Sequence, residues 1–567
     1  MADMNSILES LLPIVEQLKD MQPFLPTYAH LIVSALIPIY TGAHASLSRP
    51  SSAAKPKKKS KVESDSEDEE EDEGKDTGSK MEGLEPSDAL MFPLMAGLTL
   101  GGLYLIIKWL KDPSILNKIL SFYFSQMGLF FAGALLRDGL KVLRSYIFPT
   151  TYSSGGHQWK VNQSKRIFAS IERGSDTIAI ERTSPLPGFL GAIPLPATFR
   201  NSFWGLRAVV YQKVQLRIKA LTSFKAKVRI DMLDVTAAIS ALVAVTYFAF
   251  FAKPWWLTNL LGFSFCYGSL QVISPSTFTT GSLILASLFF YDIYFVFFTP
   301  LMVTVATKLD VPIKMVFPRP AGPNEDPNEI SLAMLGLGDI VVPGMMIGLA
   351  LRFDLFLYYK YKSIMLSKKE SSAEGAEKAV YQRATGGWGE RFWTGSNASK
   401  LLSFPKPYFY ASIVGYISGM VVTLIAMQFS QHAQPALLYL VPGVLISLWS
   451  TAYFRKELNS MWSFSDMMAD EESKENIEED KEKEGKKIST KAGLFARIWS
   501  GDLKSQLDNV EAKKDDEHPN KKSLVEKSSS DEETSEASSN DSIPSNTDAE
   551  VEKCIFSLSI SMPRRKV

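Results

Sequence analysis

Two aspartates lie inside long apolar segments of the chain, where a carboxyl group is costly. Asp292 stands in LASLFFYDIYFVFF and Asp339 stands in LAMLGLGDIVVPG. An ionisable side chain at membrane depth usually serves a function, because the hydrocarbon interior offers no water to solvate its charge. These two residues are therefore the first candidates for chemistry.

The predicted membrane spans place the two carboxyl groups at similar depths. Asp292 lies about 11 residues before the end of one segment and Asp339 about 9 residues after the start of the next, which gives depths of about 16 and 13 Å at roughly 1.5 Å per residue. Helices that follow each other in sequence are often neighbours in space. We expect the two carboxyl groups to face each other near the middle of the membrane.

A pair of carboxyl groups in a site of low dielectric can act as an acid and a base. Two carboxylates a few ångströms apart cannot both ionise there, so the pair shares a proton. One member can deprotonate a water molecule towards a peptide carbonyl while the other protonates the carbonyl oxygen. A proton-coupled transporter could use the same pair, and a lone buried aspartate is often only a hydrogen-bond partner, so the residue types alone leave these alternatives open.

The residues around the two aspartates fit a shaped site. Tyr291 places a phenol beside Asp292, and Gly336 and Gly338 remove side chains just before Asp339, which allows close approach of another backbone. The last predicted span opens on residues that weaken helical hydrogen bonding, namely Gln434, Pro435 and Ala436. Glycine and proline in membrane helices often serve only packing and kinking, so these residues support a site without proving one.

The composition excludes several other classes of function. The 567 residues include 61 Lys and Arg against 61 Asp and Glu, which argues against nucleic-acid binding because that function needs a basic excess. With 2 Cys and 5 scattered His, none in an H-E-x-x-H pair, the sequence predicts no metal site and no zinc protease. It also has no G-x-S-x-G motif, which disfavours a serine hydrolase.

The hydrophobic pattern predicts an all-α polytopic membrane protein with about nine transmembrane helices. Each segment has roughly the 20 predominantly apolar residues that a helix needs to cross a bilayer. The predicted spans are 24–46, 89–107, 115–136, 235–251, 256–273, 281–303, 330–351, 408–429 and 434–453.

The charges that flank these spans predict the orientation. The first span follows an acidic flank and precedes KPKKKSK, so the positive-inside rule places the N-terminus in the lumen and the basic tract in the cytosol. The resulting organisation is a lumenal tail (1–23), three spans (24–136) with a disordered cytosolic linker at 47–88, a cytosolic loop (137–234), six spans (235–453) with a cytosolic loop at 352–407, and a largely disordered cytosolic tail (454–567).

Three motifs in order carry a resemblance to a known family. YD in one predicted span, GLGD in the next and QPALLYLVP in the last resemble the signal peptide peptidase family of GxGD intramembrane aspartyl proteases, which are relatives of presenilin. Four further segments are similar to the same family and extend the resemblance over most of 24–465: YTGAHASL, FPLMAGLTLGGLYL, PIKMVFP and LRFD.

The resemblance implies a presenilin-like fold and assigns roles to particular residues. Asp292 and Asp339 would form the catalytic pair, in a core built from the sixth, seventh and ninth spans. The residues implied to shape the site or contact substrate are Tyr291, Gly336, Leu337, Gly338, Gln434, Pro435, Ala436 and Leu437. PIKMVFP would offer an edge to an unwound substrate strand, and the family uses no metal or organic cofactor.

The resemblance also implies the reaction and the partners. We expect an aspartic endopeptidase of the endoplasmic reticulum membrane that cleaves transmembrane helices of type II orientation, including remnant signal peptides and tail-anchored proteins. Machinery for degradation in that compartment and a second copy of the chain are further candidate partners. A catalytically silent membrane adaptor is the alternative outside the enzyme class.

Overall fold

The computed structural model describes residues 22–55, 81–110, 114–155, 157–171, 178–220, 224–301, 304–305, 314–319, 331–370, 378–382, 388–394, 404–430, 434–466 and 556–561. The chain divides into two units, which are described separately: residues 1–212 with 231–494 and Val567, and residues 213–230 with 495–566. The predictions for the tail before Gln22, for 56–80 of the linker and for 467–555 of the C-terminal tail lie outside the described residues.

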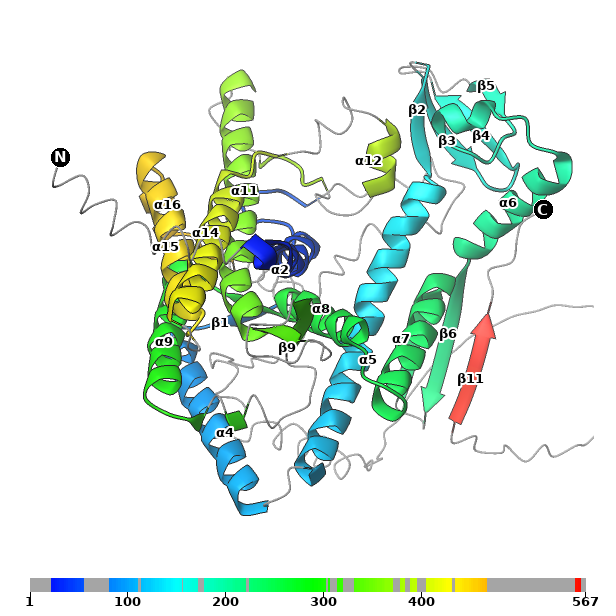
Figure 1. The fold of residues 1–567 in the computed structure, drawn as a ribbon. Helices are drawn as coiled ribbons and strands as arrows, with labels where there is room; N and C mark the ends of the chain where they lie inside the picture. The colour runs from blue at the N-terminus through cyan, green and yellow to red at the C-terminus, as the bar shows by residue number, and fades with distance from the viewer. Residues whose placement is uncertain are drawn as a thin grey trace, which may run out of the picture. The chain divides into compact units, whose positions relative to one another are not determined.

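Among the described residues of the first unit, nine long helices make up most of the structure, and Figure 1 shows how they are arranged. They are α2 (Leu25–Ala45), α4 (Asp88–Leu110), α5 (Ser114–Ile147), α7 (Met232–Phe250), α8 (Trp255–Val272), α9 (Phe278–Phe297), α11 (Gly338–Glu370), α14 (Pro407–Ser430) and α15 (Leu437–Phe454). The shorter helices are η1 (Gln22–Phe24), η2 (Gly188–Ala192), α6 (Ala197–Val210), α12 (Trp388–Thr394) and α16 (Leu458–Trp462).

Eight helices in the described part of the chain are long and apolar enough to cross a membrane. The chain is therefore a mostly helical, polytopic membrane protein, as the hydrophobic pattern predicts. The ninth long helix, α8, lies where the fifth span is predicted, but its 18 residues are less apolar and include polar residues such as Asn259 and Gln271. A membrane crossing by α8 stays a prediction.

Small sheets accompany the helices and were not predicted from the sequence. In the first unit, β2 (Thr151–Ser154), β3 (His157–Asn162), β4 (Ile167–Ile171) and β5 (Ile178–Arg182) form an antiparallel sheet in that order, β9 (Lys314–Arg319) pairs with β10 (Ser331–Gly336), and β1 (Glu82–Leu84) pairs with β8 (Ile273–Pro275). In the second unit, β11 (Phe556–Ser561) and β7 (Phe224–Asp231) flank β6 (Lys213–Ala220).

The prediction of a span beginning at residue 330 is wrong. Residues Ser331–Gly336 form the strand β10, and α11 begins only at Gly338. A short apolar run such as SLAML suits a buried strand as well as a helix, and glycine is a poor helix former. Asp339 consequently lies in the first turn of α11 and not in the middle of a helix.

The core of the first unit surrounds α11. This helix packs against α2, α8, α9, α14 and α15, and 83% of its most apolar window is buried, against 6% for α4. An apolar helix with such a low buried fraction is suited to face lipid, whereas an enclosed one is suited to hold a site. The three helices that carry the sequence motifs, α9, α11 and α15, are mutual neighbours within this core.

Candidate active site

Asp292 is held near the C-terminal end of α9 against the beginning of α15. Its side chain is 5% exposed, and its Oδ2 accepts a hydrogen bond from the backbone N–H of Leu437 at 3.1 Å. The first N–H groups of a helix have no partner within the helix and carry a partial positive charge, so they suit a carboxylate. The start of α15 therefore supplies a fixed donor to the Asp292 carboxyl group.

Asp339 is positioned by the strand that precedes it and by a tyrosine from α14. The hairpin of β9 and β10 ends at the pair of Gly336 with Lys314, and the chain then enters α11. The Tyr416 hydroxyl donates to the backbone carbonyl of Asp339 at 3.4 Å, and Tyr416 is fully buried. The Asp339 and Asp292 carboxyl groups interact electrostatically, so α9 and α11 bring the two predicted residues into one site.

The two glycines before Asp339 have different surroundings. A Cβ on Gly336 would lie 3.2 Å from Oδ2 of Asp339, whereas a Cβ on Gly338 would have no described atom within 4 Å. Leu337 between them packs towards α8, because a Cβ on Gly262 would lie 3.3 Å from its Cδ2. Gly336 is thus the glycine whose missing side chain leaves room for the carboxyl group.

The segment Gln434–Leu437 contributes to the site mainly through its backbone groups. Ala436 is the N-cap of α15, and Pro435 and Ala436 accept hydrogen bonds from the N–H groups of Leu438 and Tyr439, both at 3.2 Å. The Gln434 amide donates to Ser430 Oγ at the end of α14, at 2.9 Å. Leu437 is the first residue of α15, and its N–H is the donor that reaches Asp292.

Tyr291 lies between the site and α4. Its ring packs on Phe295 at 4.5 Å between centroids, and a Cβ on Gly97 of α4 would lie 3.7 Å from its Cε2. The phenol also interacts electrostatically with Asp292. Tyr291 therefore borders the carboxyl pair on the side of α4.

The strand expected to bind substrate, β9, already has the outward backbone groups of one residue hydrogen-bonded within the protein. In β9, Val316 donates its N–H to Asn259 Oδ1 at 2.7 Å and accepts from Asn259 Nδ2 at 2.8 Å at its carbonyl. Val316 pairs with Met334 of β10. The N–H and C=O of Val316 therefore point away from β10. In an antiparallel pair, two residues that face each other either both bond across the pair or both point outward, so the N–H and C=O of Met334 point away from β9.

Sequence reasoning missed the close contact between α14 and α15. A Cβ on Gly419 would lie 2.7 Å from the Tyr439 carbonyl oxygen, and Cβ atoms on Gly415 and Gly443 would collide with each other's carbonyl oxygens. The G-x-x-x-G spacing of Gly415 and Gly419 is a signal for such packing and could have revealed it. This contact fixes the start of α15 relative to α14, which carries Tyr416.

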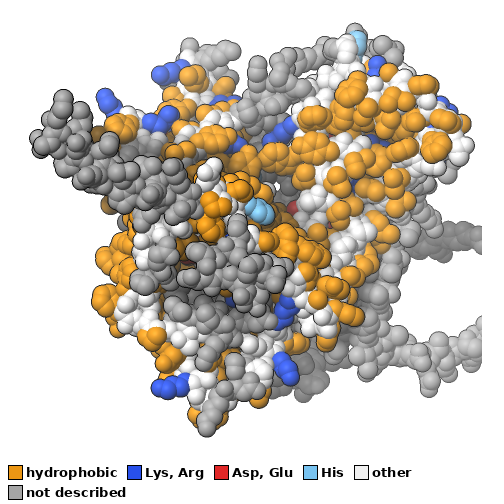
Figure 2. Space-filling model, in the orientation of Figure 1, with side chains coloured by type: hydrophobic (Ala, Val, Ile, Leu, Met, Phe, Trp, Pro, Cys, Tyr) orange, Lys and Arg blue, Asp and Glu red, His pale blue; other side chains and the backbone are white. Residues whose placement is uncertain are grey.

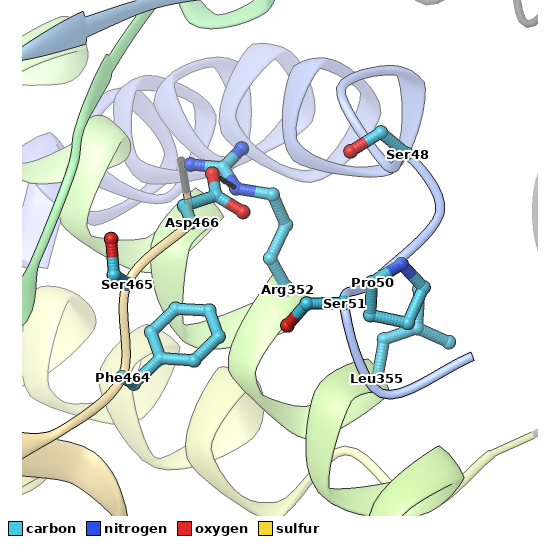
Figure 3. A pocket seen from close by; sticks show the side chains of 8 residues that line it. All are labelled: Ser48, Pro50, Ser51, Arg352, Leu355, Phe464, Ser465 and Asp466. Atoms are coloured by element: carbon cyan, nitrogen blue, oxygen red, sulfur yellow. Dashed lines mark ion pairs between the residues drawn. The ribbon is translucent and has the colours of Figure 1, made fainter. Parts of the chain in front are cut away.

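The LRFD motif holds the bundle together away from the carboxyl pair. Arg352, 4% exposed, pairs with Asp466 Oδ2 at 2.8 Å and donates to Ser46 Oγ at 2.9 Å and to Ser274 Oγ. Figure 3 shows the Arg352–Asp466 ion pair in a cavity of ≈ 10 Å³, which has room for about one water molecule. Asp354 accepts from the N–H groups of Tyr408 and Phe409 at 3.2 and 2.9 Å and so caps the N-terminus of α14.

The sequence is similar to known intramembrane proteases. A family model described as signal peptide peptidase matches residues 76–468. A probable intramembrane protease of Schizosaccharomyces pombe is 36% identical over 237 residues, which cover 42% of this chain and 65% of that protein.

Two relatives from mammals match over a longer stretch. The signal peptide peptidases of Mus musculus and Homo sapiens are 28% and 27% identical over 460 and 456 residues, and each match covers 80% of this chain and 88% of the relative. The matched region contains all the motifs of the sixth, seventh and last predicted spans. The chain therefore belongs to the signal peptide peptidase family and is a multi-pass intramembrane aspartic protease.

Proposed function

We propose that Asp292 and Asp339 are the catalytic pair of this protease and that they hydrolyse peptide bonds within transmembrane helices. The observation that carries the proposal is the electrostatic interaction of the two carboxyl groups, which come from the neighbouring helices α9 and α11 within the enclosed core. Such a pair shares a proton, so that one carboxyl group can act as a base and the other as an acid.

The hydrogen bond from Leu437 favours one assignment of the two roles. An N–H donor stabilises a negative charge on Asp292, so Asp292 is the carboxylate that takes a proton from the attacking water. Asp339 then carries the shared proton and gives it to the carbonyl oxygen of the scissile peptide bond. The roles reverse when the tetrahedral intermediate collapses and the leaving amine takes a proton.

The outer edge of β10, which no strand of the described residues covers, suits an unwound substrate. A helical substrate hides its carbonyl groups in backbone hydrogen bonds, and these bonds must open before water can attack. The N–H and C=O of Met334 point away from β9, five residues before Asp339, and can pair with an extended segment of substrate. The edge expected at PIKMVFP is therefore assigned to β10 instead.

We also propose the orientation and the compartment. The predicted loop 137–234 begins later in the structure, because α5 continues to Ile147. Residues 148–231, between α5 and α7, carry 13 Lys and Arg against 4 Asp and Glu, which supports a cytosolic side for this connection and a lumenal N-terminus. With this orientation the expected substrates are type II helices, including remnant signal peptides and tail-anchored proteins, in the endoplasmic reticulum membrane. The mouse and human relatives are named as signal peptide peptidases, which supports signal peptides as a substrate class.

A cleavage assay with purified protein tests this function. Synthetic signal-peptide helices are incubated with wild type, Asp292→Asn and Asp339→Asn, and the products are identified by mass spectrometry. Asp138→Asn is the matched control, because Asp138 lies in α5 and accepts from the Tyr267 hydroxyl at 2.9 Å, outside the proposed site. Cuts within the apolar stretch should persist in the control and vanish in both site variants.

Two results would contradict the proposal. Cleavage that survives in a folded Asp292→Asn or Asp339→Asn chain would exclude that residue from catalysis. Equal cleavage of one helix in type I and type II orientation, in reconstituted membranes, would contradict the proposed substrate orientation while leaving the catalytic pair intact. An adaptor role would instead predict that the Asp339→Asn chain restores the function of a deletion strain.

A further inference from the structure

The short helix α6 has a buried polar face that fixes its position. Trp204 donates from Nε1 to the Thr183 carbonyl at 3.0 Å, and Arg207 donates from Nη2 to the Pro149 carbonyl at 2.9 Å. Arg207 also donates from Nε to Gln163 Oε1 at 3.1 Å. Since Trp204 and Arg207 are only 2% and 1% exposed, α6 is locked against the sheet of β2 to β5.

The opposite face of α6 is apolar and exposed. Phe199, Leu206 and Val209 are 61%, 51% and 47% exposed, and their spacing places them along one side of the helix. Phe189 of η2 and Ile193 just after it, 75% and 49% exposed, extend the apolar surface. Figure 2 shows hydrophobic side chains gathered at the upper right, over the region where Figure 1 places α6 and β2 to β5.

Hydrogen bonds tie the end of α6 to the ends of two membrane helices. Arg144 of α5 donates to the Val210 carbonyl at 3.3 Å, and the Tyr211 hydroxyl donates to the Phe148 carbonyl at 2.6 Å. The N–H of Met232, the first residue of α7, donates to the Gln212 carbonyl at 3.4 Å. The C-terminus of α6 therefore lies at the level where α5 ends and α7 begins.

The ends of α5 and α7 beside α6 carry exposed apolar side chains of their own. Exposed apolar side chains occur at the end of α5, at Tyr146 and Ile147, and at the start of α7, at Met232 and Val235. Both helices are among the candidate membrane spans. The lipid that surrounds α5 and α7 can therefore also cover the exposed side of α6.

Two exposed cations lie in a turn that contacts the buried side of α6. The turn between β3 and β4 exposes Lys165 and Arg166, and its Gln163 contacts α6 through Arg207 and the Trp204 carbonyl. Residues 148–231, which connect α5 to α7 and contain α6, include 13 Lys and Arg against 4 Asp and Glu. An amphipathic helix with an apolar stripe and nearby Lys and Arg is typical of a segment that lies in the membrane interface.

We propose that α6 and η2 form an interfacial anchor that binds a phospholipid surface. Phe199, Leu206 and Val209 enter the boundary between headgroups and acyl chains, and Lys165 and Arg166 face the lipid phosphates. The anchor would hold the small sheet of β2 to β5 against the membrane from which α5 and α7 emerge. This inference does not depend on the proposed catalytic pair.

Lipid-quenching of a fluorescent label tests the anchor in the full-length protein. Cys266 and Cys554 are replaced by Ala and Ser, and a single cysteine at Leu206 or Asn201 carries an environment-sensitive dye in nanodiscs of neutral and anionic phospholipids. Asn201 is the matched control, because it is exposed on the same helix but lies on a different side from Leu206.

We expect the emission of the dye at position 206 to be blue-shifted. Lipids labelled near the headgroup should quench it at least about twofold more strongly than they quench the dye at position 201. Higher salt, or the double variant Lys165→Gln/Arg166→Gln, should weaken the quenching at position 206 in anionic nanodiscs. A label at Val209 should repeat the result and exclude an effect peculiar to one substitution.

Three outcomes would overturn the anchor. Equal, water-like emission at positions 201 and 206 would show that the apolar face meets solvent. A blue-shifted dye at position 206 that labelled lipids do not quench would show that protein covers this face. Quenching that is insensitive to salt and to the loss of both cations would contradict the proposed contact with lipid phosphates.

Discussion

The backbone N–H of Leu437 lies 3.1 Å from Oδ2 of Asp292, although 145 positions separate the two residues in sequence. This hydrogen bond joins the start of α15 to the proposed catalytic carboxyl group of α9. It gives the stretch from Gln434 to Leu437 a physical role, since the helix start that follows Pro435 and Ala436 exposes a donor where a carboxylate needs one.

Replacing the Leu437 amide by an ester removes this donor without changing the side chain. We expect a fall in kcat of about 10- to 150-fold, because a hydrogen bond to a charged group contributes about 1.5–3 kcal/mol. Incorporation of the α-hydroxy analogue of leucine at position 437, followed by single-turnover cleavage, measures the effect. Leu437→Ala, which keeps the N–H, is the control, and an unchanged kcat in the ester variant would refute the role.

Gly336→Ala should disturb the site, whereas Gly338→Ala should be mild. The new Cβ at position 336 would stand 3.2 Å from Asp339 Oδ2, while position 338 has open space among the described residues. We expect a loss of about 10-fold in kcat for Gly336→Ala with little change in thermal stability, because small displacements of catalytic groups are costly. Similar kinetics for the two variants would contradict this reading of the glycines.

Met334→Pro tests the open edge of β10. Proline removes an N–H that points away from β9, so the hairpin should persist while pairing with an extended substrate is lost. We expect kcat/KM to fall about 3- to 10-fold, which corresponds to one ordinary hydrogen bond. Met334→Ala keeps the N–H and should remain close to wild type, and a matching loss in that variant would point to the side chain instead.

The Arg352–Asp466 pair should show a characteristic double-mutant cycle in thermal unfolding. Asp466→Ala leaves a buried guanidinium without its carboxylate and should destabilise the protein by about 3 kcal/mol. Adding Arg352→Met removes that uncompensated charge, so the double variant should unfold at a higher temperature than Asp466→Ala alone. Simple addition of two losses would mean that the two residues act independently.

The lowered pKa of Glu457 predicts that the stability of the folded protein depends on pH. Burial alone raises the pKa of Glu457, but hydrogen bonds from Tyr408, Tyr361 and Arg455 outweigh it and hold the pKa below its ordinary value of 4.5. Ionised Glu457 therefore stabilises the fold above pH 4.5, and this contribution is lost as the pH falls through the lowered pKa. Glu457→Gln should lower the thermal midpoint at pH 7 and have a smaller effect near pH 4; an equal effect at both values would exclude this linkage.

The side-chain types and their order determined the class of this protein. Long apolar runs predict membrane helices because a spanning segment must satisfy its own backbone, and eight such helices are present in the described residues. Asp292 and Asp339 stood out because carboxyl groups are rare at that depth. The motifs around them indicated the family, which the match over 76–468 confirmed.

Tertiary structure decided how the site is assembled. An apolar run has no periodic signal that separates strand from helix, so only the structure shows β10 before α11 and puts Asp339 in the first turn of that helix. Hydrogen bonds that use backbone groups, such as Leu437 to Asp292 and Tyr416 to Asp339, leave no trace in side-chain type. They depend on which helices pack together, and that packing is a property of the whole chain.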